Sequence, residues 1–221
     1  MKILRSISNS IFIALALGTL SLTHAGEGEW KSLFNGKDFD GWEYRGKMEG
    51  GPIFKVEDGV IVASTVIPRN PTTYMATTKS YGDFELVFDS YVEKNLNTGV
   101  QFRSTAKGSM VGPQLEIDNN RVQTGYIWGQ GMKKWLSPDW PKKNPAFKPN
   151  EWNTYRLKVV GKNIKTWIND QPIEDVTQDE ISDSGVIALQ AHSYPSGKDR
   201  AKGAEEVVSV YWKNIKIREI E

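Results

Sequence analysis

The sequence contains no cysteine, so the 221-residue chain can form no disulfide bond and carries no cysteine that could be lipid-modified. It also has almost no excess of charge of either sign. The 28 Lys and Arg residues against 27 Asp and Glu residues give a net charge of +1 at pH 7, and basic residues never form a long run. A protein without a basic field has no means of attracting a polyanion, so nucleic-acid binding is not expected.

Long apolar runs are also missing. The run at residues 11–20 is too short to cross a bilayer as a helix. It follows the basic residues Lys2 and Arg5, and it precedes small residues, ending at Ala25, of the kind that a signal peptidase reads. We therefore predict a signal peptide over residues 1–25 that is cleaved after Ala25. The mature protein is expected to be exported, either periplasmic or secreted, without a lipid anchor or a membrane span.

The mature chain, residues 26–221, is predicted to be a single all-β domain. The sequence is 38% hydrophobic and 11% aromatic, enough for one well-packed core, and it has no repeat, low-complexity tract or linker. Helical periods with caps are absent. Alternating apolar and polar residues, rich in β-branched and aromatic types, occur at residues 83–93, 99–104, 154–170 and 207–220. Such strands without helices between them predict a two-sheet antiparallel β-sandwich, a jelly roll.

The stretch PQLEID, residues 113–118, places three polar side chains on one face of a predicted strand. Gln114, Glu116 and Asp118 alternate with apolar residues, and side chains two apart in a strand point the same way, about 6.5–7 Å apart. Two carboxylates at this spacing could serve a retaining glycosidase, which needs them about 5–5.5 Å apart. In jelly-roll glucanases whose strand reads Glu-x-Asp-x-Glu, the last glutamate is catalytic. Here Asn120 holds that position, and an amide cannot transfer a proton.

Three further stretches present side chains that could converge on this strand. His192 is the only histidine outside the predicted signal peptide, and histidine titrates near neutral pH, which suits proton transfer. Each stretch alone is equally compatible with a structural role, because aromatic rings also fill cores and a lone histidine is often structural. The pairs that should share a strand face are Gln101 with Arg103 in GVQFRS, Gln190 with His192 in ALQAHS, and Tyr126 with Trp128 in GYIWGQ.

The segment of residues 129–149 is rich in Pro, Lys and Trp and is too long for a hairpin loop. Long ordered loops in compact domains often carry function. We predict that Trp128, and with it Trp135 and Trp140, stacks against sugar rings. Four other tryptophans, Trp42, Trp152, Trp167 and Trp212, are expected to be structural.

Several longer motifs follow one another along the mature chain. They are SLFNGKDFDGWE, FKVEDGVIVAS, YGDFELVFDSYVEKNLNTGVQFRS, PQLEIDNN, NEWNTYRLKVVGKNIKTWINDQPIEDVTQ, GVIALQAHS and VSVYWKNIKIREI. In this order they resemble the 3-keto-disaccharide hydrolase domain family. The resemblance implies a concanavalin A-like jelly roll that cleaves glycosides oxidised to a ketone at C3, with a partner oxidoreductase that makes the ketone. It also implies a polar cluster of Arg103, Gln114, Glu116, Asp118, Gln190 and His192.

The chemistry implied by this resemblance needs a base, a donor to an enolate oxygen, and an acid. A C3 ketone acidifies the C2 proton, so its removal gives an enolate from which the C1 oxygen leaves by β-elimination, and water then adds. Under this hypothesis Glu116 or His192 is the base, while Arg103 with Gln114 or Gln190 holds the carbonyl oxygen. Alternatively, Glu116, Asp118 and His192 could ligate a divalent cation that polarises the ketone.

Two other function classes stay open at this point. A non-catalytic carbohydrate-binding module would share the jelly roll, the export signal and the surface tryptophans. A conventional glycoside hydrolase would use Glu116 and Asp118 as its carboxylate pair, although Asn120 weakens that interpretation. All three classes predict an oligosaccharide or glycoside as the ligand.

Overall fold

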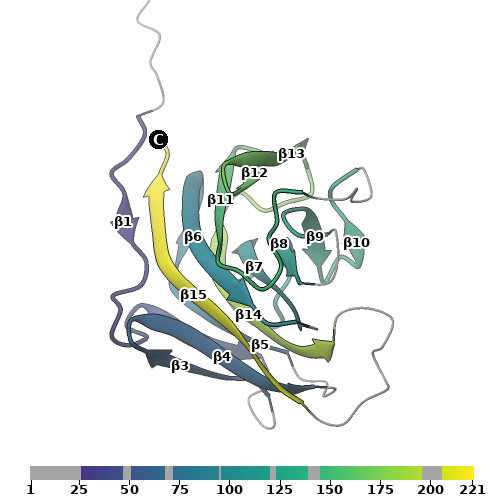
Figure 1. Cartoon of the computed structure of the whole chain (residues 1–221). Helices are drawn as coiled ribbons and strands as arrows, with labels where there is room; N and C mark the ends of the chain where they lie inside the picture. Colours follow the sequence, from purple (N-terminus) through teal and green to yellow (C-terminus); the bar gives the residue numbers. More distant parts are fainter. Residues whose placement is uncertain are drawn as a thin grey trace, which may run out of the picture.

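The protein is a sandwich of two antiparallel β-sheets that pack face to face (Figure 1). This computed structural model describes residues 26–46, 51–67, 72–94, 96–119, 123–138, 145–195 and 206–221. These residues contain strands, turns and loops but no helix, so within them no helix is long and apolar enough to cross a membrane. The predicted all-β jelly roll is confirmed. The predicted signal peptide lies outside the described residues.

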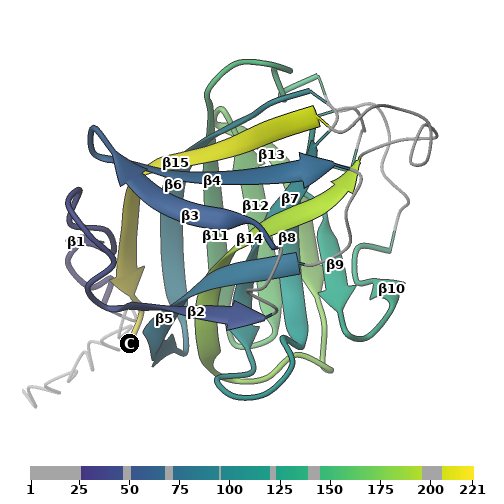
Figure 2. The same cartoon turned by 90° about the horizontal axis from the view of Figure 1, so that it is seen from below.

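One sheet has eight strands, and we call it the back sheet. Its hydrogen-bonded order is β13-β12-β11-β6-β15-β4-β3, with β1 pairing on β15. Figure 2 shows β15, β4 and β3 running side by side at one end of this layer. The strands are β1 (Lys31–Ser32), β3 (Ile53–Glu57), β4 (Val60–Ile67), β6 (Phe84–Val92), β11 (Asn153–Val160), β12 (Asn163–Ile168), β13 (Gln171–Thr177) and β15 (Glu206–Glu219).

The second sheet has seven strands, and we call it the front sheet. Its order is β10-β9-β8-β7-β14-β5-β2, so β7 lies between the two strands that carry most of the predicted polar cluster. The strands are β2 (Trp42–Gly46), β5 (Thr72–Tyr81), β7 (Leu96–Ser104), β8 (Gly112–Asp118), β9 (Ile127–Gln130), β10 (Lys134–Trp135) and β14 (Gly185–Pro195).

The core lies between the sheets and is built from the apolar positions of the alternating strands. Phe84, Leu86 and Phe88 of β6 meet Leu115 and Ile117 of β8, and all five side chains are fully buried. Each such burial contributes roughly 1.5–3 kcal/mol to folding. Because inward positions alternate with outward ones, both sheets turn a second row of side chains to their outer faces.

The four tryptophans expected to be structural fall into two groups. Trp42 and Trp212 are buried in the core, where Trp212 stacks on Phe54 with ring centroids 6.0 Å apart. Trp167 and Trp152 lie instead on the outer face of the back sheet. Trp167 is covered by the Arg156 guanidinium at 4.5 Å, whereas Trp152 keeps 39% of its surface exposed.

Candidate functional site

Strand β8 presents its three polar side chains to the outer face of the front sheet. Gln114, Glu116 and Asp118 alternate with the core residues Leu115 and Ile117, as the sequence pattern predicts. The three polar side chains are nonetheless buried, with at most 7% exposure, which Glu116 has. Buried polar groups need hydrogen-bond partners, so the surroundings of this strand determine what the side chains can do.

A chain of carboxamides runs across three strands of the front sheet. Gln101 Nε2 of β7 donates to the side-chain oxygen Oε1 of Gln114. Gln114 Nε2 in turn donates to Glu116 Oε2 at 2.7 Å and to Gln190 Oε1 at 3.2 Å. Gln190 Nε2 then reaches the Tyr74 hydroxyl oxygen of β5 at 3.4 Å. The chain fixes the orientation of each amide, so Glu116 faces a donor that cannot rotate away.

Asn97 holds the two carboxylates of β8 from the neighbouring strand. It pairs directly with Asp118 across the β7–β8 ladder, and its Nδ2 donates to Glu116 Oε1 and, at 3.4 Å, to Asp118 Oδ2. An amide donor holds the two carboxylates in place without adding charge to the site. Sequence reasoning missed Asn97, although alternation along β7 puts it on the same face as Gln101.

Gly99 makes room for this arrangement. A Cβ atom at this position would lie 2.4 Å from Gln114 Nε2 and 2.7 Å from its Cδ, closer than atoms can approach. The Gln114 side chain therefore crosses β7 over Gly99 to reach Gln190 on β14. Sequence reasoning missed Gly99 as well. A glycine carries no functional group, and Gly99 matters only because it leaves space for the Gln114 side chain.

Tyr74 adds a neutral hydroxyl to the cluster. Burial raises the pKa of this tyrosine, the hydrogen bond from Gln190 opposes that effect, and the negative charge of Glu116 raises the pKa further. Tyr74 therefore stays protonated at ordinary pH and acts only as a neutral donor or acceptor.

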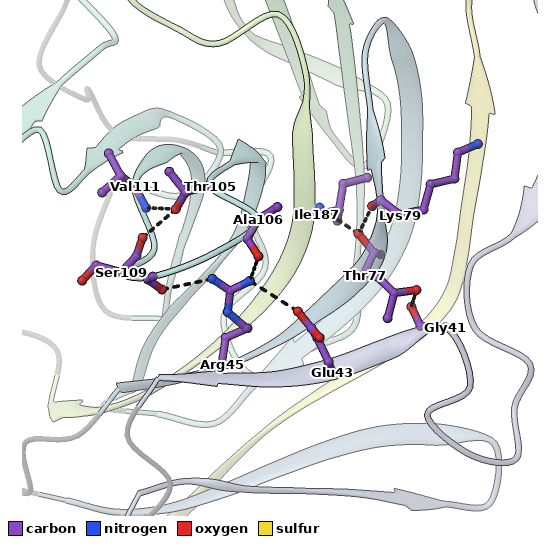
Figure 3. A network of polar contacts seen from close by, with 12 residues as sticks. Gly41, Glu43, Arg45, Thr77, Lys79, Thr105, Ala106, Ser109, Val111 and Ile187 are labelled. Atoms are coloured by element: carbon purple, nitrogen blue, oxygen red, sulfur yellow. Dashed lines mark hydrogen bonds and ion pairs between the residues drawn. The ribbon is translucent and has the colours of Figure 1, made fainter.

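The loop of residues 105–111 closes one end of the front face. Met110 of this loop packs against a small apolar cluster on the sheet surface. Figure 3 shows Arg45 of β2 at the same loop, where its guanidinium donates to the carbonyl oxygens of Ala106 and, at 3.0 Å, Gly108. The loop is thus fixed at both its apolar and its polar contacts. The other members of the apolar cluster are Tyr74, Ala76, Val186 and Ala188.

His192 lies on β14, two residues beyond Gln190, and is half-buried. Its Nδ1 atom is 2.6 Å from the Thr72 hydroxyl of β5. His192 and Glu116 therefore belong to the same sheet, with β7 between their strands. A hydroxyl partner on Nδ1 helps to fix the orientation of the imidazole ring.

Arg103 does not join this cluster, and the expectation that it holds a carbonyl oxygen there is wrong. Its side chain is only 1% exposed and turns to the end of the sandwich. The guanidinium donates to the carbonyl oxygens of Gly82, Gly161 and Ser182 and forms an ion pair with Asp83. Burial lowers the pKa of Arg103 and the Asp83 carboxylate raises it. This is the bonding of a structural arginine.

Arg103 turns away from the cluster because the alternation of strand β7 is broken at this residue. The β7–β14 ladder shifts register between Val186 and Ala188, opposite the end of β7. At the same place Arg103 adopts a left-handed backbone conformation with φ of 44°. A residue two after Gln101 would share its face only in a regular strand, so the irregularity sends Arg103 elsewhere.

The aromatic residues flank the cluster on the β9 side. Trp128 pairs directly with Gln114 across the β8–β9 ladder and meets Trp135 of β10 edge to face, with ring centroids 5.3 Å apart. Tyr126 is half-buried, and its carbonyl oxygen accepts from the Glu116 amide. Trp128 therefore adjoins the cluster. Trp140 lies outside the described residues.

The proposed metal ligands do not gather into a binding set. Within the described ranges, no three His, Asp or Glu side chains come close enough to share a metal ion. Glu116 and Asp118 are bridged by the Asn97 amide, while His192 is paired with Thr72. The donor arrangement therefore does not fit a cation held by these three residues.

The fold and the front face define a jelly-roll sandwich that combines carboxylates, carboxamides and indole rings on one outer surface. The sequence comparison agrees with this class. The chain belongs to the 3-keto-alpha-glucoside-1,2-lyase-like domain family, a carbohydrate-active family whose sequence model matches residues 29–218. The resemblance found in the sequence motifs is thereby confirmed. No curated protein matches the chain.

Several solved structures share the fold. A provisionally assigned glycosyl hydrolase from Parabacteroides distasonis is 22% identical, with a TM-score of 0.60 over 88% of this chain and 94% of that one. The carbohydrate-binding module CBM66 from Bacillus subtilis is 15% identical, with a TM-score of 0.56 over 80% and 94% of the two chains. A lichenase from a mouse hindgut metagenome is 12% identical, with a TM-score of 0.59 over 87% and 98%. At these identities the likeness concerns the fold alone.

Proposed function

We propose that this protein is an enzyme that cleaves 3-keto glycosides by elimination followed by hydration. The observation that carries the proposal is the Glu116 carboxylate, which is nearly buried and held by two amide donors, Asn97 and Gln114. A fixed, desolvated carboxylate suits proton abstraction from carbon, because it need not reorganise before reacting. Membership of the family supports the substrate class.

The reaction balances without an added oxidant or reductant. Glu116 removes the C2 proton, the electron pair moves toward the C3 carbonyl to give an enolate, and the bond from C1 to the glycosidic oxygen breaks as the enolate collapses. The leaving oxygen takes up a proton. Water then adds across the C1–C2 double bond, with hydroxyl at C1 and a proton at C2, to give the free 3-keto sugar.

The other side chains of the front face divide the remaining tasks. Gln190 Nε2 donates one of its two hydrogens to Tyr74, so its carboxamide can offer the second to the ketone oxygen. His192 is the second proton-transfer group, which donates to the leaving oxygen or serves as the base in place of Glu116. Trp128 provides a ring face for the sugar. Asp118, behind Asn97, orients that amide and through it Glu116.

Incubation with a matched pair of ordinary and 3-keto disaccharides tests the proposal. Monosaccharide should be released from the keto form alone, and reaction in D₂O should place deuterium at C2 of the product. Release from the ordinary disaccharide would indicate a conventional glycosidase using Glu116 and Asp118. Affinity without release from either sugar would indicate a binding module.

Variants of the carboxylates and the histidine assign the roles. Glu116→Gln and His192→Asn should each lower turnover by about 10²-fold or more, the scale for losing a positioned acid or base. Asp118→Asn should cost less, because an orienting residue does not itself transfer the proton. Unchanged melting temperatures are the control. Near-normal turnover in both Glu116→Gln and His192→Asn would contradict the proposed site.

Dependence on a divalent cation is tested separately, by elemental analysis of the purified protein and by turnover before and after chelation. Loss of a bound ion together with activity in Asp118→Asn would assign that residue to a metal. Retention of activity after chelation would show that the side chains described above act without a divalent cation.

We also propose that the protein works outside the cytoplasm, in the periplasm or as a secreted enzyme. The support is the predicted signal peptide, so N-terminal sequencing of the exported protein should begin at Gly26. Recovery of the exported protein with residues 1–25 intact would contradict this. If the protein works outside the cytoplasm, an oxidoreductase that oxidises glycosides at C3 would supply its substrate there.

A further inference from the structure

Three aromatic rings form a hollow on the outer face of the back sheet, on the opposite side of the core from the proposed active site. Tyr91 of β6, Tyr211 of β15 and Trp152, which immediately precedes β11, are its lining residues. Their ring centroids lie 5.6–6.4 Å apart in all three pairs, and the rings are inclined to one another by 48–67°. The hollow between them has a volume of about 230 Å³.

Core packing does not explain these rings. Tyr91 and Tyr211 alternate with the buried core residues Val92 and Val210, so they point outward from the sandwich. Trp152 keeps 39% of its surface exposed. Tyrosine and tryptophan at exposed positions are enriched where a protein binds something, because they combine apolar area with a polar group.

The hollow is held in shape by charged neighbours. The Lys213 ammonium group lies 4.1 Å from the Trp152 ring centroid, a cation–π contact. The Tyr211 hydroxyl donates to Glu93 Oε1 at 3.2 Å, and the other oxygen of Glu93 accepts from the Ser209 amide at 2.8 Å. The rings are therefore fixed before a ligand arrives, with a carboxylate and an ammonium group in contact with them.

We propose that this hollow is a second carbohydrate site, which binds a pyranose ring of a glycan or glycoside without cleaving it. A pyranose has an apolar C–H face that can lie against the aromatic rings of the hollow, and hydroxyl groups that can donate to Glu93 and accept from Lys213. The choice of a sugar as the occupant rests on the proposed function, since a glycoside-cleaving enzyme gains local substrate concentration from a separate binding site.

The size of the patch favours a small ligand over a protein partner. An aromatic side chain buries about 150–250 Å² when fully covered, and these three rings already cover much of one another. The ring surface that remains exposed is well below the roughly 800 Å² per partner that a stable protein interface buries. One sugar ring, by contrast, needs only one exposed ring face and a few polar groups around it.

The test is a titration of the Glu116→Gln protein with methyl α-glucoside, maltose and maltoheptaose, followed by the indole N–H signal of Trp152 in ¹H–¹⁵N spectra. The signal is assigned by its loss in Trp152→Ala. At least one sugar should shift it at millimolar concentration, and Tyr211→Ala should weaken that binding by about tenfold, the order expected for lost aromatic contact. Unmodified sugars and an inactivated front site keep the result independent of the proposed reaction.

Trp167→Ala is the matched control, because Trp167 lies on the same face under an arginine but outside the hollow. It should leave sugar binding unchanged. The proposal is wrong if no sugar moves the Trp152 signal, or if Trp167→Ala weakens binding as much as Tyr211→Ala. It is also wrong if Trp152→Ala instead converts a dimer to a monomer in size-exclusion chromatography, which would make the hollow a protein interface.

Discussion

Gly99 shows at the scale of one residue how the front site depends on an absent side chain. The Gln114 carboxamide occupies the position that a Cβ would take, and this carboxamide connects Glu116 to Gln190. The backbone of Gly99 needs no special conformation, because its φ angle is not positive. A substitution here should therefore act on the site more than on the fold.

We expect Gly99→Ala to lower turnover on a 3-keto glycoside by about tenfold or more, because the added methyl displaces Gln114 and leaves Glu116 with one fixed donor fewer. Steady-state kinetics and a thermal melt measure the two effects. Gly82→Ala is the control, since its Cβ would meet nothing closer than 3.8 Å. Normal turnover in Gly99→Ala would show that the carboxamide chain is dispensable.

At the residue scale, a variant of Trp128 can distinguish sugar stacking from core packing. It adjoins Gln114 and packs on Trp135, yet remains partly exposed. Trp128→Leu should raise KM more than it lowers kcat, because a stacking ring contributes to binding in the ground state and the transition state alike. Kinetic constants of the purified variant test this. A lower melting temperature with unchanged kinetics would assign Trp128 to packing.

Strand alternation allowed part of the site to be predicted from single residues. It placed Gln114, Glu116 and Asp118 on one face because β8 is regular, and it failed for Arg103 because the ladder is broken beside that residue. Asn97 could have been found by the same rule. The role of Gly99 could not, since it depends on which side chain crosses it from the next strand.

At the scale of elements, Arg103 ties three connections together. Its guanidinium bonds to the β5–β6 turn through Gly82 and Asp83, to the β11–β12 turn through Gly161, and to the β13–β14 connection through Ser182. The β5–β6 turn and the β13–β14 connection each join the two sheets, whereas the β11–β12 turn lies within the back sheet, so one side chain fixes the same end of both sheets. Arg103 is therefore expected to contribute to stability.

Arg103→Met should lower the free energy of unfolding by about 2–4 kcal/mol, because it leaves Asp83 and three carbonyl oxygens without their shared donor. Turnover per folded molecule should stay near the wild-type value. Urea denaturation and active-site kinetics measure these separately. A large loss of turnover with unchanged stability would instead return Arg103 to the reaction, as the sequence pattern suggested.

The strands themselves were largely predictable, whereas their arrangement was not. The alternating segment of residues 154–170 forms β11 and β12, and residues 207–220 cover most of β15. The order of the strands in each sheet depends on pairing between segments far apart in the chain, which a local pattern does not encode. The closure of the front face by the loop of residues 105–111 also depends on a distant partner, Arg45.

At the scale of the whole molecule, the sandwich separates two outer faces with different surfaces. The front face carries buried carboxylates and carboxamides, and the back face carries the aromatic hollow, with the apolar core between them. Several tyrosines contribute to the core and its edges. Their burial makes the stability of the whole sandwich depend on pH in the alkaline range.

Tyr155 is the strongest case, since it is fully buried and stacks on Phe88 with ring centroids 5.1 Å apart. Burial raises the pKa of its hydroxyl far above the usual range. In the unfolded chain a tyrosine ionises near pH 10, so above this pH the unfolded state binds fewer protons than the folded state. Stability is therefore unaffected below about pH 10 and falls above it, by about 1.4 kcal/mol per pH unit for one fully buried tyrosine.

Tyr155→Phe keeps the ring and its stacking on Phe88 but removes the titrating group. The variant should unfold at a higher pH than the wild type in an alkaline titration followed by far-ultraviolet circular dichroism, and the two proteins should have similar pH dependence between pH 6 and about pH 9. Tyr91→Phe, on the outer face of the back sheet, serves as the control for loss of a hydroxyl. An unchanged alkaline midpoint in Tyr155→Phe would show that groups other than Tyr155 govern unfolding at high pH.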